Sequence, residues 1–480
     1  MATSDAGSRV AALRVLYRGL VAALPWLDVC RDEDDLPAFP GYATDLRLPA
    51  VARAPVGTTS ARPAGPRLAV YAPAQSGSLS DAARDSARTR TPLVVRHTDV
   101  DLPRLGELAR AHPTLPLVIE SGPLKLLYHI ATLETLLQTH PNLWLCTYNL
   151  CNWLGLERLC AAGVGDRLLF GTHAPRYDAH VSVAPIALAH LSWEQRCDLA
   201  GNNARRLLGL PAVSAPSPDL AAPLPPAFII DSHGHNGPPG RFPTPDEHFT
   251  PDDWLRFMDS CAIERLFLTP AAALDDPACG SLDAARSLLE AAPDRFRCYA
   301  VFHPGADTER LRAELDDPLC VGLKMHPSMH GVPADDPAYR PAFELAVRAG
   351  KPLVTHSWEN SATNPVQYLS HPARFETHLR AWPGVRLILG HAGGRPSTAP
   401  TVIALGERYP AVTVDLSGDY FDSGLVAMLC DRLGAQRVLF ASDVNWVDPR
   451  CLLGAVLGSR LSDREAEDCL RGNALALLDR

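Results

Sequence analysis

Short apolar runs recur at a regular interval through the second half of the chain. Eight runs of strand type, spaced by roughly 25 to 35 residues, alternate with segments of helical character. Runs this continuous are typical of strands buried on both faces of a parallel sheet. They are Phe228–Ile230, Arg265–Leu268, Cys298–Phe302, Val321–Met325, Pro352–Thr355, Leu387–Leu389, Val412–Leu416 and Val438–Phe440. The pattern predicts an α/β fold with a C-terminal (β/α)8 TIM barrel over residues 227–480.

The alternative for such a pattern is an open, doubly wound sheet, but no glycine-rich dinucleotide loop follows the first run. Helix-start signals agree with the barrel. The segment 250–253 offers an N-cap threonine, a proline at the first helical position and an acid at the third. Ser462 is placed to cap a helix over Asp463–Leu470. At the N-terminus, apolar residues and arginines alternate at helical spacing over Val10–Leu24, which predicts an amphipathic helix rather than a signal peptide.

Residues 211–226 are rich in proline, alanine and serine and show neither helical nor strand periodicity. Proline fixes φ and removes a backbone donor, so this stretch is expected to be an extended linker. It divides the chain into a domain over 1–210 and the barrel domain over 227–480.

Composition narrows the classes of partner. The formal net charge is -9, and phosphate contacts need a basic face, so no nucleic-acid partner is expected. No apolar run is long enough to span a bilayer, so no membrane partner is expected. The 12 cysteines include no Cys-x-x-Cys pair and are typical of reduced thiols in a cytoplasmic protein.

Metal-binding residue types follow four of the predicted barrel strands. In such barrels the chemistry lies at the carboxyl ends of the strands, which meet at one rim. A His-x-His dyad on a strand directs both rings to the same side. Imidazole nitrogens and carboxylate oxygens are the donors that zinc and related divalent ions accept. The residues are His233 and His235 after the first run, His356 after the fifth, His391 after the sixth and Asp443 after the eighth.

These positions, together with the Gly322–Pro327 run and the closing 471–474 segment, resemble the amidohydrolase superfamily. The resemblance is to its amidohydrolase-related branch of hydrolases and decarboxylases, and it spans nearly all of 227–480. It implies one divalent metal ion, zinc or alternatively manganese. The implied ligands are His233, His235, His356 and Asp443, with His391 beside the water that the metal holds. The resemblance also implies that Lys324 contacts substrate, although in some superfamily members a carbamylated lysine on this strand bridges two metals.

The chemistry of such a site agrees with hydrolysis. A divalent ion lowers the pKa of its water to about 7. Asp443 is predicted to accept that water's proton and pass it to the leaving group, and His391 to orient the nucleophile. His303, His326 and Trp358 fall near the same rim and are predicted, with Lys324, to contact a small-molecule substrate.

Three functions stay open at this stage. The first is hydrolysis of a small amide, ester or lactone. The second is non-oxidative decarboxylation of a small unsaturated or aromatic carboxylic acid, by the same site. The third is a catalytically inactive barrel that acts as a binding or scaffold protein. The sequence does not identify the substrate. It also leaves open whether the chain forms a homo-oligomer.

Residues 91–210 echo the second half of the barrel. Four short motifs recur in the same order, pairing 91–95 with 351–355, 112–119 with 382–389, 166–172 with 436–442, and 200–208 with 470–478. They predict an internal repeat and an incomplete, degenerate barrel-like α/β domain. In this register Arg96, Ser121 and His173 replace His356, His391 and Asp443, so no metal ligands are expected there. A different site using His97, Glu120 and His173 is the alternative.

Overall fold

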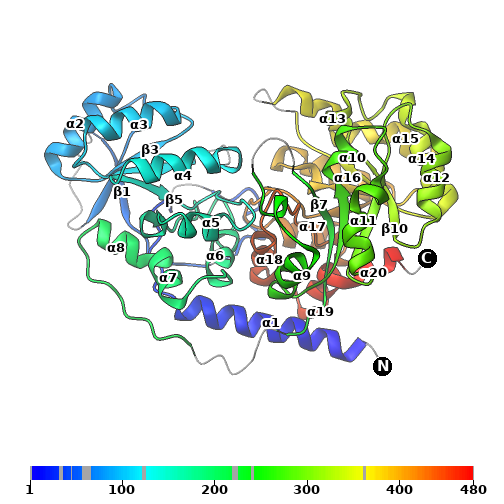
Figure 1. Cartoon of the computed structure of the whole chain (residues 1–480), viewed down its shortest axis with the longest axis horizontal. Coiled ribbons are helices and arrows are strands. Elements are labelled where there is room, and N and C mark those ends of the chain that lie inside the picture. Colours follow the sequence, from blue (N-terminus) through cyan, green and yellow to red (C-terminus); the bar gives the residue numbers. More distant parts are fainter. Residues whose placement is uncertain are drawn as a thin grey trace. The chain divides into compact units, whose positions relative to one another are not determined.

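The structure is a computed structural model of the chain. It describes residues 3–31, 36–44, 46–56, 66–121, 126–218, 225–238, 243–360 and 364–478. The chain forms two compact units. The N-terminal unit is Tyr17–Ala221, and the C-terminal unit is Ala222–Arg480 together with Met1–Leu16. The boundary falls inside the first helix, α1 (Thr3–Ala23) (Figure 1).

The C-terminal unit is a barrel of eight parallel strands, each paired with its neighbours in the sequence. The first and last strands meet where Ser232 N donates to Phe440 O (3.1 Å) and Asp443 N to His233 O (2.8 Å). The predicted (β/α)8 barrel is therefore confirmed. Its strands are β7 (Ile229–Asn236), β8 (Ile263–Pro270), β9 (Phe296–Val301), β10 (Cys320–Met325), β11 (Leu353–His356), β12 (Leu387–Gly390), β13 (Thr413–Asp415) and β14 (Val438–Leu439).

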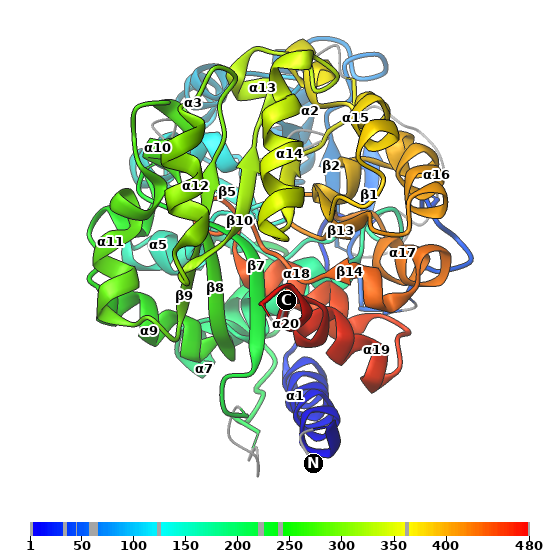
Figure 2. The same cartoon turned by 90° about the vertical axis from the view of Figure 1, so that its right-hand side faces the viewer.

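Helices surround these strands on the outside (Figure 2). They are α9 (Pro251–Ser260), α10 (Ala271–Asp275), α11 (Ser281–Ala291), α12 (Thr308–Asp316), α13 (Pro327–His330), α14 (Arg340–Ala349), α15 (Glu376–Ala381), α16 (Ala399–Arg408), α17 (Leu425–Leu433), α18 (Pro449–Gly458), α19 (Asp463–Glu467) and α20 (Asn473–Leu478). The predicted cap of α9 is present, since Thr250 Oγ1 accepts from Asp253 N.

The last predicted helix, Asp463–Leu470, differs from the observed one. Ser462 caps α19 as expected, but α19 ends at Glu467 and a π-helical turn over Asp468–Gly472 follows. The turn brings Asn473 against the barrel, where its Nδ2 donates to the backbone oxygens of Ala435 (2.8 Å) and Val438 (2.7 Å). A local π turn thus lets one side chain satisfy two backbone acceptors.

The barrel interior below the rim is apolar. Side chains alternate along a strand, so each strand sends one face inward. The inward residues are Ile230, Phe267, Tyr299, Val321, Val354, Ile388 and Leu439, packed with Ala474. Strand residues beyond this layer, at the carboxyl ends, are free to carry polar chemistry.

The N-terminal unit contains six parallel strands in sequence order. They are β1 (Ala52–Pro55), β2 (Arg67–Val70), β3 (Leu93–Arg96), β4 (Leu117–Glu120), β5 (Leu143–Cys146) and β6 (Leu168–Leu169). Residues Asp28 and Val29 join the two edges of this sheet. Asp28 N donates to Pro49 O (2.8 Å), Val51 N to Asp28 O (2.8 Å) and Val29 N to Phe170 O (3.0 Å). The sheet is therefore curled into a smaller ring than the eight-stranded barrel, as the prediction of a degenerate α/β fold requires.

The helices of this unit, besides the end of α1, are α2 (Leu79–Thr89), α3 (Leu102–Ala111), α4 (Ile130–Thr139), α5 (Gly155–Ala161), α6 (Ala179–Ala187), α7 (Trp193–Cys197) and α8 (Asn203–Leu207). Helix α1 begins before the predicted Val10. Residues 211–218 of the expected linker have no helix or strand, and 219–224 lie outside the described residues. The division into domains 1–210 and 227–480 stays a prediction. Among the described residues, every helix is too short or too polar to cross a bilayer.

Asn203 in the N-terminal unit corresponds to Asn473 in the pairing of 200–208 with 470–478. It offers a test of how such an asparagine satisfies two backbone acceptors. This fully buried side chain donates to Gly165 O (2.9 Å) and Leu168 O (2.8 Å). We expect Asn203→Ala to lower the opening free energy of β6 by about 2 kcal/mol, because buried acceptors lose their donor. Native-state hydrogen exchange measures this. The exposed Gln138→Ala, which loses one bond to Ala162 O, should change it by less than about 0.5 kcal/mol.

Candidate metal centre

The first and last barrel strands are held together at the rim by one buried carboxylate. Asp231 Oδ1 accepts from His233 N (3.3 Å) and Ser442 N (3.0 Å), and Oδ2 accepts from Ser442 Oγ (2.5 Å). These bonds fix the backbone on both sides of the rim. As a result His233 and Asp443, which are 210 positions apart in the numbering, are placed next to one another.

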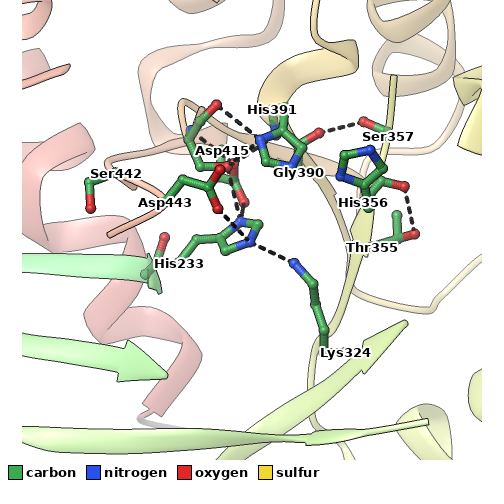
Figure 3. Close-up of polar contacts among 12 residues, drawn as sticks. His233, Lys324, Thr355, His356, Ser357, Gly390, His391, Asp415, Ser442 and Asp443 are labelled. Atoms are coloured by element: carbon green, nitrogen blue, oxygen red, sulfur yellow. Dashed lines mark hydrogen bonds and ion pairs between the residues drawn. The ribbon is translucent and has the colours of Figure 1, made fainter. Parts of the chain in front are cut away.

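Three donor atoms converge at this rim. One ligand atom each from His233, His391 and Asp443 lies within 4.8 Å of the others. His235 joins them through Asp443, whose Oδ1 is 3.0 Å from His235 Nε2 and 3.8 Å from His233 Nε2. Figure 3 shows the side chains of His233, His391 and Asp443 pointing toward a common centre.

In each of three histidine rings, the Nδ1 atom already has a hydrogen-bond partner in the protein. The Nδ1 of His233 faces Asp415 Oδ2 (2.8 Å), that of His235 faces Thr269 O (2.9 Å), and that of His391 faces Ser417 O (3.1 Å). An acceptor at Nδ1 fixes the tautomer in which Nε2 carries the free lone pair. The three rings are therefore oriented as metal ligands are, with Nε2 toward the centre.

The protonation states of this cluster also suit a cation. Burial lowers the pKa of His233 to about 4, and it lowers those of His356 and His391. These rings are neutral at pH 7 and can donate a lone pair. Burial opposes ionisation of Asp443, but its hydrogen bond with His235 and the charges of neighbouring histidines hold its pKa below the usual value. The donor set of neutral imidazoles and one carboxylate fits a divalent ion.

The tight group lacks two of the predicted ligands, His235 and His356, and contains His391 instead. His356 Nε2 is engaged by Gln367 Oε1 at 2.8 Å, and His391 rather than His356 completes the tight group with His233 and Asp443. The ring of His356 remains close, with its centroid 4.6 Å from that of His391. The assignment of His233, His235, His356 and Asp443 as ligands, and of Asp443 and His391 as catalytic groups, stays a prediction.

Lys324 lies at the floor of the cluster. Its side chain is 1% exposed, and Nζ is 2.6 Å from His233 Nε2. Burial lowers the pKa of Lys324 to about 8, against the raising effect of Asp415 and Asp443. The structure thus places a cationic nitrogen directly beside the predicted metal position.

Three of the predicted substrate contacts, His326, Trp358 and His303, lie in two different places. The rings of His326 and His356 are stacked, with centroids 4.0 Å apart and an interplanar angle of 11°. Trp358 continues this wall, 5.7 Å from His356 at 6°. His303 instead packs against His330 (4.3 Å) and bonds Ala273 O through Nε2 (2.8 Å). The stacked wall borders the cluster, whereas His303 has its described contacts elsewhere.

Sequence reasoning missed the buried partners of the histidines. Asp415 ends β13, accepts from His391 N (2.9 Å) and receives Ser417 Oγ (2.5 Å). Burial opposes its ionisation, but the charge and hydrogen bond of His233 hold the pKa of Asp415 below its usual value. The rule applied to the other strands, a polar residue at the carboxyl end, would have found it. Gln367, in the 3-10 helix Pro365–Ser370 after β11, has no comparable sequence signal.

Two functional side chains sit on strained backbone. His391 has φ 61° and Asp443 has φ 69°, in the left-handed region that non-glycine residues rarely occupy. Such residues persist only where surrounding contacts hold them, and they concentrate at active sites. The strained pair lies at the ends of β12 and β14, where it presents both side chains to the centre.

The amidohydrolase family model matches residues 230–480, just over half of the chain, and the chain belongs to this family of metal-dependent enzymes. The resemblance expected from the sequence is therefore confirmed. The chain is similar to a 2,6-dihydroxybenzoate decarboxylase from Rhizobium, at 17% identity and TM-score 0.41, covering 53% of this chain and 98% of that one. No curated protein matches the sequence.

Two other solved structures are similar over the same part. A dihydroxybenzoic acid decarboxylase from a Polaromonas species, with bound manganese and the inhibitor 2-nitroresorcinol, is 17% identical at TM-score 0.40; the match covers 52% of this chain and 96% of that one. An uncharacterized TIM-barrel protein from Bordetella bronchiseptica is 17% identical at TM-score 0.43, covering 52% and 99%.

Asp415 tests the orientation of the ligand rings. We expect Asp415→Asn to weaken zinc or manganese binding by about 10- to 100-fold, because His233 loses the acceptor that fixes its tautomer. Competition titration against a chromophoric chelator measures the affinity. Asp419→Asn is the matched control, since Asp419 is also buried at this rim but pairs with Arg395 at 3.3 Å. Equal weakening in both variants would contradict the role of Asp415.

Proposed function

We propose that the C-terminal unit is a metal-dependent decarboxylase of a small, planar carboxylic acid. The observation that carries this proposal is the position of the buried Lys324 ammonium, 2.6 Å from His233 Nε2 and beside the converging donors. A divalent ion and the Lys324 ammonium would place positive charge at the centre of the cluster, which favours an anionic substrate over a neutral amide, ester or lactone.

The wall of stacked rings gives the substrate its shape. His326, His356 and Trp358 are nearly parallel, with interplanar angles of 11° and 6° between neighbours. Rings stacked in this way cover one another's faces and present their edges, against which the face of a flat aromatic or conjugated acid can pack. Neutral imidazoles leave this wall uncharged at pH 7, since burial lowers the pKa values of His326 and His356 well below their usual value. The nearby Arg395 guanidinium, 4.8 Å over the Trp358 ring, is paired with Asp419, so we assign recognition of the carboxylate to Lys324.

The reaction divides its work between the metal and the chain. A divalent ion bound by the histidines and Asp443 would polarise the substrate's oxygen atoms. The residues of the chain hold the acid in place as its bond to the carboxylate carbon breaks. The electron pair stays on the substrate carbon, carbon dioxide leaves, and that carbon takes a proton. Lys324 carries N–H protons beside the centre and is the proposed donor. Two of the similar structures described above are named for reactions of this kind.

Hydrolysis of a small carbonyl compound is the second candidate. It is favoured by Asp443, whose carboxylate lies 3.0 Å from His235 Nε2 and could accept a proton from an attacking water. Zinc and manganese both suit the donor set. The choice of metal and the cytoplasmic location predicted from the cysteines belong to the same proposal, as does the small-molecule substrate.

Isotope incorporation separates the two candidates. We expect the metal-loaded protein to release carbon dioxide from an aromatic or conjugated acid, and the product formed in D2O to carry one deuterium where the carboxylate was. Mass spectrometry of products from a panel of acids, esters and lactones measures this. Incorporation of one ¹⁸O from labelled water into a new carboxylate, with no carbon dioxide released, would instead establish hydrolysis. His233→Ala, which removes a predicted ligand, should abolish either reaction.

Lys324 can be tested apart from the metal. We expect Lys324→Met, of similar length and without charge, to lower kcat/KM for the acid by about 100-fold, because the site loses its cation and proton donor. Metal content, measured by inductively coupled plasma mass spectrometry, should stay at that of the wild type. A variant with normal metal content and normal turnover would exclude this role for Lys324.

A further inference from the structure

The N-terminal unit repeats the rim of the barrel bond for bond. Asp28 Oδ1 accepts from Cys30 N (2.9 Å) and Thr172 N (3.3 Å), and its Oδ2 accepts from Thr172 Oγ1. Asp231 makes the same three bonds to His233 N and Ser442. Two copies of a bond pattern this specific place Asp28 at the position of Asp231 and Cys30 at that of His233.

Strand register extends the match to the other rim positions. Arg96 pairs with Glu120 across β3 and β4, as His356 pairs with Gly390 across β11 and β12. Cys146 pairs with Leu169, as Asp415 pairs with Leu439. His173, with φ 50°, follows Thr172 as the strained Asp443 follows Ser442. The positions of His233, His356 and Asp443 are therefore held in this unit by Cys30, Arg96 and His173.

The centre of this second rim holds an ion network. Glu120 is 1% exposed, and it stands where Gly390 stands in the barrel, at a position whose added Cβ would lie 3.3 Å from His233 Cε1. Its Oε2 accepts from Arg53 Nη2 (2.7 Å), and its Oε1 lies near Arg96 Nε (3.3 Å) and His173 Nε2 (3.0 Å). A glutamate and an arginine thus occupy the space that corresponds to the metal centre.

The network has more cationic than anionic groups facing it. Each guanidinium has five N–H donors and uses one on Glu120, and the described residues give its other donors no partner. The other carboxyl group nearby, Asp28, bonds Thr172 and the backbone of Cys30 and neither arginine. The Arg96 side chain is 40% exposed, so its free N–H groups reach solvent.

We propose that this strand-end cluster, Arg53, Arg96, Glu120 and His173, is a binding site for a small oxyanion, a carboxylate or a phosphate. The carboxyl ends of parallel strands are where ligands bind in folds of this kind. Guanidinium groups with free parallel N–H donors match the oxygens of both anions. Glu120 holds the two arginines at a fixed separation, so they are oriented before the ligand arrives. The ligand takes the outer edges of the guanidinium groups, on the side away from Glu120.

Titration calorimetry of the full chain tests this site. The protein is dialysed against EDTA so that a metal in the C-terminal unit cannot bind the anion, and sodium phosphate and sodium benzoate are titrated separately at low ionic strength. We expect one anion per chain, with binding weakened about tenfold or more in Arg96→Gln. Arg104→Gln is the matched control, because Arg104 is an exposed arginine paired with Glu107. This variant should bind the anion as the wild type does.

The two anions, together with a hydrogen-exchange measurement, distinguish the possible results. Binding of phosphate alone, benzoate alone or both supports the site and names its ligand class. Hydrogen-exchange protection by the anion should appear in β3 and β4 and not in β11 and β12, which separates this site from the one in the barrel. No binding heat, or equal binding in wild type and Arg96→Gln, would overturn the proposal and leave the cluster an internal ion network.

Discussion

The buried contact between Asp231 and Ser442 is the constraint on which the active rim depends. A barrel must join its last strand to its first, and here one carboxylate accepts hydrogen bonds from both. Burial raises the pKa of Asp231 to about 7, because the charged form of a carboxyl group is disfavoured away from solvent. The cost of this burial is offset by hydrogen bonds that fix His233 and Asp443. The bonds of Asp231 hold the backbone from which the His233 and Asp443 side chains extend. The bonds that close the barrel therefore also place these two residues next to one another.

A second carboxylate extends this order around the rim. Asp415 contacts the ring of His233 and the backbone of His391, and Ser417 Oγ lies 3.0 Å from the Nδ1 of both rings. The histidines are therefore held by protein contacts in the orientation that a metal needs. A preorganised site loses little side-chain entropy on binding. The bonds to Asp415 and Ser417 hold His391 at its positive φ, and those to His233 O and His235 Nε2 hold Asp443.

The sequence predicted the barrel well because its signals are periodic and local. Eight apolar runs and the cap at Thr250 were each visible without tertiary information. The site was less predictable. The rule of polar strand ends found His233, His391 and Asp443, but it could not show that Gln367, from the 3-10 helix Pro365–Ser370, contacts the ring of His356. The π turn before Asn473 was also missed, because it is stabilised by backbone oxygens of a distant strand that no local pattern specifies.

The two units show which parts of a rim are architecture and which are chemistry. Asp28 and Thr172 repeat the bonds of Asp231 and Ser442, so the contact that joins strands is kept where the other rim residues differ. The residues that differ are those whose side chains reach the centre, with Cys30 for His233, Cys146 for Asp415 and Glu120 for Gly390. Gly390 leaves room for the histidine rings in the barrel. Glu120 fills the corresponding space in the N-terminal unit, and neighbouring arginines stabilise its buried charge. The two rims thus share the contact that joins their strands and differ at the positions whose side chains reach the centre.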